Sequence, residues 1–136
     1  MKAIFYPVAA LVALTFAVGI RMYFARVGAA RKRRVRVEDF RLGESPNVPA
    51  DVALPNRNFM NLFEMPVLFY VACVILFVTN AVDGLALVLA WLYVASRIAH
   101  SLIHLTYNNV IHRLAAFAAS NVVLLVLWVR LVVTLG

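Results

Sequence analysis

The chain has 136 residues, of which 65% are hydrophobic and only 14% are charged, and its mean hydropathy is +0.90. A soluble domain of this size cannot bury so much apolar surface, so the composition predicts a protein that uses the bilayer as its solvent. The net charge is +7, and the basic residues are clustered in one region rather than spread in a stripe along the chain. Cys73 is the single cysteine. These features exclude a secreted disulfide scaffold, a disordered tail and a nucleic-acid-binding module.

Four apolar runs are each long enough to cross a hydrocarbon core of roughly 30 Å at about 1.5 Å per residue. They predict an all-α fold, a single-domain integral membrane four-helix bundle with helices at about 3–30, 58–81, 85–107 and 111–135. Asp83-Gly84 and Asn108-Asn109 mark the short turns between the last three helices. Pro66 is expected to kink the second helix near its start rather than to end it.

The segment 31–57 is predicted to be an irregular loop, because it holds three of the prolines and most of the charge. Nine of the 13 basic residues lie between Arg21 and Arg57. The positive-inside rule therefore places this loop in the cytoplasm and both termini on the opposite side, as in a multi-pass protein of a bacterial inner membrane. The basic run is also expected to lie on anionic lipid headgroups. Arg130, near the far end of the last helix, does not fit the charge bias.

Ionisable and polar residues within membrane spans are functional candidates, because each is costly unless it is paired or hydrated. Helical spacing places Arg57, Asn61 and Glu64 on one face of the second helix and Arg97, His100 and His104 on one face of the third. Arg113 lies at the start of the fourth helix, so all seven are expected in one layer near the cytosolic side. Arginines bind carboxylates and a glutamate binds an ammonium group, so the set suits a small ligand that carries both. The alternative is that Glu64 and Arg97 neutralise each other and hold their two helices in register.

The histidines could also indicate a metal site, since His100 and His104 are four residues apart and His112 could be a third ligand. No acidic residue or cysteine completes a closed ligand set, however, and the nearby Arg97 and Arg113 would repel a cation. We therefore expect no metal, and one histidine could instead donate a proton.

Two stretches resemble a known family. RNFMNLFEMPVLF, which begins at Arg57, resembles the second-helix signature of the MAPEG superfamily, the membrane-associated proteins of eicosanoid and glutathione metabolism. SRIAHSLIHLTYNNVIHRLAAF, which begins at Ser96, resembles the superfamily's third and fourth helices. The resemblance implies a left-handed four-helix bundle that assembles as a homotrimer. It also implies that glutathione is bound as co-substrate between neighbouring subunits at the cytosolic side.

By position, the resemblance implies a catalytic role for Arg113, which would stabilise the glutathione thiolate. It implies that glutathione is bound by six further residues: Arg57, Asn61, Glu64, Arg97, His100 and His104. Several positions depart from the family pattern, since His104 replaces the usual tyrosine, and Leu114 and Phe117 replace hydroxyl-bearing residues of one branch.

The implied activity is that of a membrane-bound glutathione transferase or peroxidase acting on a small lipophilic substrate or a lipid hydroperoxide. The main alternative is a non-catalytic member of the same fold that binds a lipid or a partner protein. A small exporter is a third possibility, because a membrane carboxylate can bind protons and cations. The arginines around Glu64 disfavour such a cation.

Overall fold

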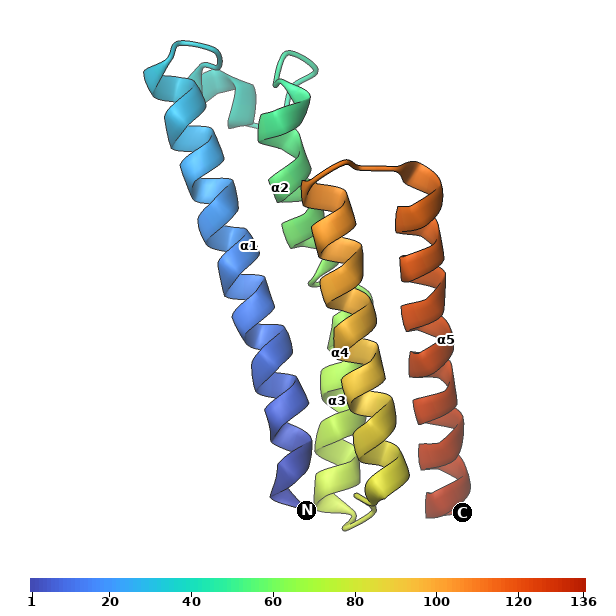
Figure 1. Ribbon diagram of the computed structural model, residues 1–136. Coiled ribbons are helices and arrows are strands. Elements are labelled where there is room, and N and C mark those ends of the chain that lie inside the picture. The colour runs from blue at the N-terminus through green and yellow to red at the C-terminus, as the bar shows by residue number, and fades with distance from the viewer.

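The computed structural model describes residues 1–136, and every regular element in it is helical (Figure 1). The long helices are α1 (Phe5–Arg31), α2 (Ala50–Asn61), α3 (Met65–Val78), α4 (Gly84–Leu105) and α5 (Val110–Leu135). Short 3-10 helices cover Lys2–Ile4 and Val37–Phe40. By length and hydropathy the chain has four candidate membrane spans, with α2 and α3 together forming the second, Ala50–Val78. The all-α prediction of a multi-pass, four-span membrane protein is confirmed.

The second span differs from its prediction in two ways. Its helix begins at Ala50 rather than near residue 58, because extended Pro49 precedes the first turn and Asp51 lies at the positive end of the helix dipole. The span is also broken rather than kinked, since the segment 62–64 separates α2 from α3. Pro66 lacks an N–H group, and its ring would clash with the carbonyl of Leu62 in a continuous helix.

The main apolar core lies in the half of the bundle that contains both termini (Figure 1). Fully buried Phe69 of α3 stacks on Tyr93 of α4, with their ring centroids 4.6 Å apart. A second, smaller cluster joins Ala29, Val35 and Val52, and it attaches the α1–α2 loop to the ends of the two helices it connects. This loop, residues 32–49, lies at the end of the bundle away from the termini, and we call that end the basic end (Figure 1).

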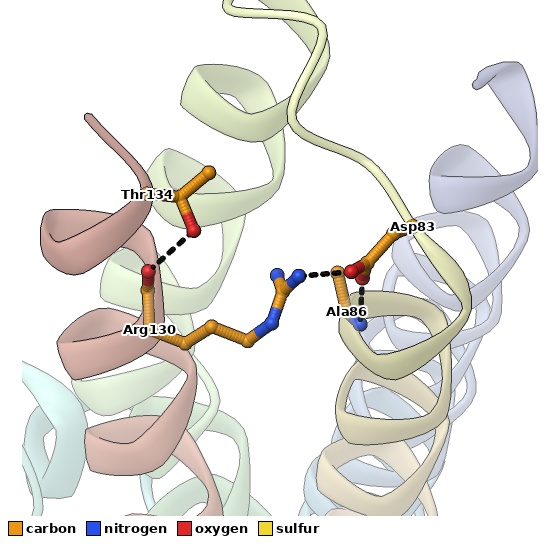
Figure 2. Close-up of polar contacts among 4 residues, drawn as sticks. All are labelled: Asp83, Ala86, Arg130 and Thr134. Atoms are coloured by element: carbon orange, nitrogen blue, oxygen red, sulfur yellow. Dashed lines mark hydrogen bonds and ion pairs between the residues drawn. The ribbon is translucent and has the colours of Figure 1, made fainter.

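At the end with the termini, Asp83 performs two tasks (Figure 2). Its Oδ1 accepts a hydrogen bond from the Ala86 N–H at 2.8 Å and so caps the start of α4. Its Oδ2 forms an ion pair with Arg130 of α5. The charge that did not fit the sequence pattern is therefore neutralised within the subunit, and the pair ties α5 to the α3–α4 turn.

Helix α5 is packed unevenly along its length. Its buried residues are Ser120, Leu124, Leu127 and Leu131, and none lies in the segment 110–119. In the half of α5 toward the basic end, residues 110–119, every side chain is therefore at least partly exposed in one subunit.

Candidate functional site

A polar face on α4 lies at the junction with α2 and α5. Its members follow helical spacing and are all buried: Arg97, His100, Ser101 and His104. Arg97 has an exposed fraction of 0%, which is unusual for an arginine and requires that its charge be compensated nearby.

Asn61 at the end of α2 supplies that compensation. Nη2 of Arg97 donates to Asn61 Oδ1 at 2.6 Å and lies 3.4 Å from the backbone carbonyl oxygen of Asn61. Because α2 stops at this residue, its last carbonyls have no partners within the helix and carry the negative end of the helix dipole. Arg97 thus caps the C-terminus of α2. Its guanidinium also lies 5.9 Å from the centroid of the Phe117 ring.

A second pair, which the sequence reasoning did not single out, lies beside the first. Ser101 Oγ donates to Asn58 Oδ1 at 3.2 Å, and both residues are buried. The available signal was helical spacing, because Asn58 lies three residues before Asn61 and Ser101 lies four residues after Arg97. Two polar pairs therefore hold α2 against α4.

Arg113 is held in place by the turn before α5. Its Nη1 donates to Asn108 Oδ1 at 2.7 Å, and Asn108 adopts a left-handed backbone with φ of 45° that asparagine tolerates. The backbone carbonyl of Arg113 is 3.2 Å from Nδ1 of His100. Since a carbonyl can only accept, the neutral His100 ring carries its proton on Nδ1 and leaves Nε2 as an acceptor.

These side chains line a cavity of about 210 Å³ between α2, α4 and α5. Its lining consists of Asn61, His100, Val110, Arg113, Leu114 and Phe117. Several buried nitrogens in and behind this wall have no hydrogen-bond partner: Arg97 Nε, Arg97 Nη1 and His100 Nε2. Buried polar groups are normally paired, so the site is suited to a polar ligand that offers acceptors to the Arg97 nitrogens and a donor to His100 Nε2.

Other predicted site residues lie apart from this cavity. Glu64 and Arg57 are exposed and form no ion pair, so the alternative in which Glu64 neutralises Arg97 is wrong. The break between α2 and α3 removes Glu64 from the helical register that would have aligned it with Asn61 and Arg57. His104 is buried, with its ring centroid 5.7 Å from that of His100, and its Nδ1 has no partner.

Helix α1 contributes nothing to the cavity of one subunit. Its Arg26 pairs with Glu44 at 3.4 Å. The guanidinium of Arg26 also lies 4.7 Å from the centroid of the Phe40 ring, within the α1–α2 loop. His112 contacts Tyr107 through its Nδ1, 3.0 Å from the hydroxyl, rather than His100.

Comparison with known proteins gives one positive result. The model of the MAPEG family matches residues 4–133. No curated protein and no solved structure matches the chain. The family match covers all four spans and includes both stretches that carry the cavity residues. The chain therefore belongs to the MAPEG family.

Proposed function

We propose that this protein is a glutathione-dependent transferase or peroxidase that acts on lipophilic electrophiles or lipid hydroperoxides. Membership of the MAPEG family supports a membrane protein of the eicosanoid and glutathione metabolism kind. The observation that carries the proposal is the cavity lined by Asn61, His100 and Arg113, which offers one amide, one imidazole and one guanidinium and no carboxylate. Such a lining suits glutathione, an anion with two carboxylates, one ammonium group and a thiol.

Arg113 is the residue we assign to the thiol. A free thiol has a pKa of about 8.5, and a fixed guanidinium beside it favours the thiolate, which is the nucleophile. The bond from Arg113 to Asn108 supports this role, because it holds the guanidinium before the ligand arrives. The thiolate sulfur then attacks the electrophilic carbon, the carbon–sulfur bond forms, and the leaving group departs with the bonding electrons.

We further propose that the site is completed by assembly into a homotrimer, with the basic end on the cytosolic side. The cavity is open in one subunit, and the half of α5 that lines it has no buried residue. Exposed Glu64 and Arg57 are free to meet a ligand held by a neighbouring subunit. In this arrangement Glu64 receives the glutathione ammonium group, while Arg57 receives a carboxylate.

The test is thermal unfolding of the detergent-purified protein with and without millimolar glutathione, together with turnover of a chlorodinitrobenzene-like electrophile. We expect glutathione to raise the melting temperature of the wild-type protein and of Arg41→Ala, whose exposed side chain lies in the loop. Arg113→Ala should abolish turnover, whereas Arg113→Lys should keep part of it because a charge remains. Full turnover in Arg113→Ala would refute the catalytic assignment.

A non-catalytic role in binding a lipid or a partner protein is the second candidate, and one feature favours it. An apolar groove of about 820 Å³ lies between α1 and the α2–α3 junction, with Phe16, Gly19, Phe59 and Phe63 among its lining residues. If neither glutathione nor a glutathione analogue without the thiol shifts the melting temperature, this second function replaces the first.

A further inference from the structure

The C-terminus of α1 ends in an unusual way. The Arg33 N–H donates to the Ala30 carbonyl at 3.0 Å and the Arg34 N–H donates to the Ala29 carbonyl at 2.9 Å. This pair of bonds defines a Schellman motif, in which the residue after the C-cap adopts a left-handed backbone and is usually glycine. Here that residue is Arg33, with φ of 55°.

An arginine at such a position is less stable than a glycine would be. The left-handed conformation brings the Cβ atom of an L-residue close to the following carbonyl oxygen, and glycine avoids this contact. Unfavourable backbone conformations of this kind are concentrated at binding and catalytic sites. The arginine side chain at this place therefore calls for a role that glycine could not fill.

That side chain lines a polar cavity of about 350 Å³ in the α1–α2 loop. The lining residues are Arg33, Arg34, Val35, Arg36, Asp39 and Asn47. Arg34 is already neutralised by Asp51, to which it makes two hydrogen bonds at 2.8 and 2.9 Å.

Asp39 is also fully engaged, since its carboxylate oxygens accept from the Arg36 N–H at 2.8 Å and the Ser45 hydroxyl at 2.9 Å. The guanidinium groups of Arg33 and Arg36 form no ion pair and are left, with the amide of Asn47, to face the cavity. Glu38 and Glu44 are the other acids of the α1–α2 loop, and neither lines the cavity. Two free guanidinium groups with an amide are the donors that a phosphate group requires.

The length of α1 places this cavity at the headgroup layer. Its 27 residues extend about 40 Å at the helical rise per residue, whereas the hydrocarbon core is roughly 30 Å thick and headgroups bring the bilayer to about 40–45 Å. A helix that begins at one hydrocarbon boundary thus ends among the opposite headgroups. The turn between α4 and α5 lies lower than the ends of α1 and α2 at the basic end (Figure 1).

We propose that the α1–α2 loop contains a binding site for the phosphate group of an anionic glycerophospholipid, formed by Arg33, Arg36 and Asn47. The guanidinium groups hold the phosphate oxygens, and Asn47 donates from its side-chain amide. Arg34 and Asp39 do not bind the lipid but hold the loop in the conformation that opens the cavity. This site shares no lining residue with the cavity that contains Arg113, so its failure would leave the glutathione proposal standing.

The test measures the melting temperature of the full-length protein in phosphatidylcholine nanodiscs with and without phosphatidylglycerol. We expect phosphatidylglycerol to raise the melting temperature of the wild-type protein by a few degrees. Arg36→Gln should lose most of this rise. Lys32→Gln, which removes the same charge one residue outside the cavity, should keep it. An equal loss in both variants would show that only general charge attraction is present and would overturn the site.

Arg33→Gly distinguishes lipid binding by Arg33 from a purely structural role of this residue, because the two predict different melting temperatures. In phosphatidylcholine alone it should melt above the wild-type protein, because glycine relieves the left-handed backbone, yet it should gain less from phosphatidylglycerol. A lower melting temperature in phosphatidylcholine would overturn the strain argument. Millimolar inorganic phosphate, compared with chloride at equal ionic strength, should not reproduce the effect of the lipid. If it does, the ligand is a free phosphate and not a lipid.

Discussion

Asn61→Leu is the change that most directly tests how the buried charge of Arg97 is compensated. The substitution keeps a side chain of similar size but removes the Oδ1 atom that accepts from Arg97 Nη2 at 2.6 Å. Arg97 cannot move to solvent without leaving the core, because it has an exposed fraction of 0%. Its nearest replacement acceptor is the Asn61 backbone carbonyl at 3.4 Å, a long and weak contact.

The expected cost follows from the energy of a hydrogen bond to a charged group, which is about 1.5–3 kcal/mol. Part of the loss is recovered because the carbonyl and the dipole of α2 remain, so we take about 2 kcal/mol. For a chain of this length that corresponds to a fall in melting temperature of roughly 6–10 °C. Asn61→Asp keeps the acceptor and adds a negative charge, and it should melt at or above the wild-type temperature.

The assay is thermal unfolding in detergent, followed by circular dichroism. Asn56→Leu is the matched control, since Asn56 lies on the same helix and its only side-chain hydrogen bond goes to the Met60 sulfur, at 3.8 Å. It should change the free energy of unfolding by less than about 0.5 kcal/mol. Equal melting temperatures for the Asn61→Leu and Asn56→Leu proteins would refute the view that Asn61 compensates Arg97.

Two further predictions concern groups outside the cavity. Asp83→Ala should lower the free energy of unfolding by about 1–2 kcal/mol, because it removes both the helix cap and the ion pair with Arg130. Asp83→Asn keeps the cap and should lose under about 1 kcal/mol. Chemical denaturation measures both losses, and equal losses would contradict a separate contribution from the cap. The backbone N–H of Arg36 and the Ser45 hydroxyl hold the pKa of Asp39 below its usual value of 3.8. A lowered pKa in the folded state stabilises the loop above the ordinary pKa, and this contribution disappears as the pH falls through the folded-state pKa. The Arg36 amide should therefore be protected from hydrogen exchange at pH 5, and this protection should be lost when the pH falls below the lowered pKa of Asp39. If the Asp39→Asn protein lost its protection over the same pH range, the assignment to Asp39 would be wrong.

Most of the architecture could be predicted from the sequence because the membrane imposes a simple requirement on it. The spans predicted near 3–30, 85–107 and 111–135 lie within a few residues of α1, α4 and α5. A helix that crosses hydrocarbon must be long and apolar, and both properties can be read directly along the chain.

The break in the second span could not be predicted in the same way. Whether Pro66 kinks a helix or ends it depends on what satisfies the carbonyls at the break, and here Arg97, 36 residues along the chain, contacts the carbonyl of Asn61. The same tertiary contact explains why the Glu64–Arg97 pairing failed. Helical spacing places residues on one face only while the helix continues.

The polar residues themselves were predictable, because each is unfavourable in a membrane span and therefore stands out. Asn61, Arg97, His100 and Arg113 are brought together by contacts in the structure. Their partners were harder to predict. Asp83 and Arg130 are 47 residues apart, and no local pattern links a residue in a turn to one in a distant helix.

The break between α2 and α3 makes α2 a short separate helix that is attached differently at each end. Asp51, near its first residue, is bonded to Arg34, and Asn61, at its last residue, is bonded to Arg97. These two anchor points are about 15 Å apart along the helix axis. Because α3 begins a separate helix in the apolar core, the orientation of α2 is set by these two bonds and by its packing on α1 rather than by continuity with α3. The proline that interrupts the span thus leaves one short helix that contacts the surface loop at one end and the buried guanidinium at the other.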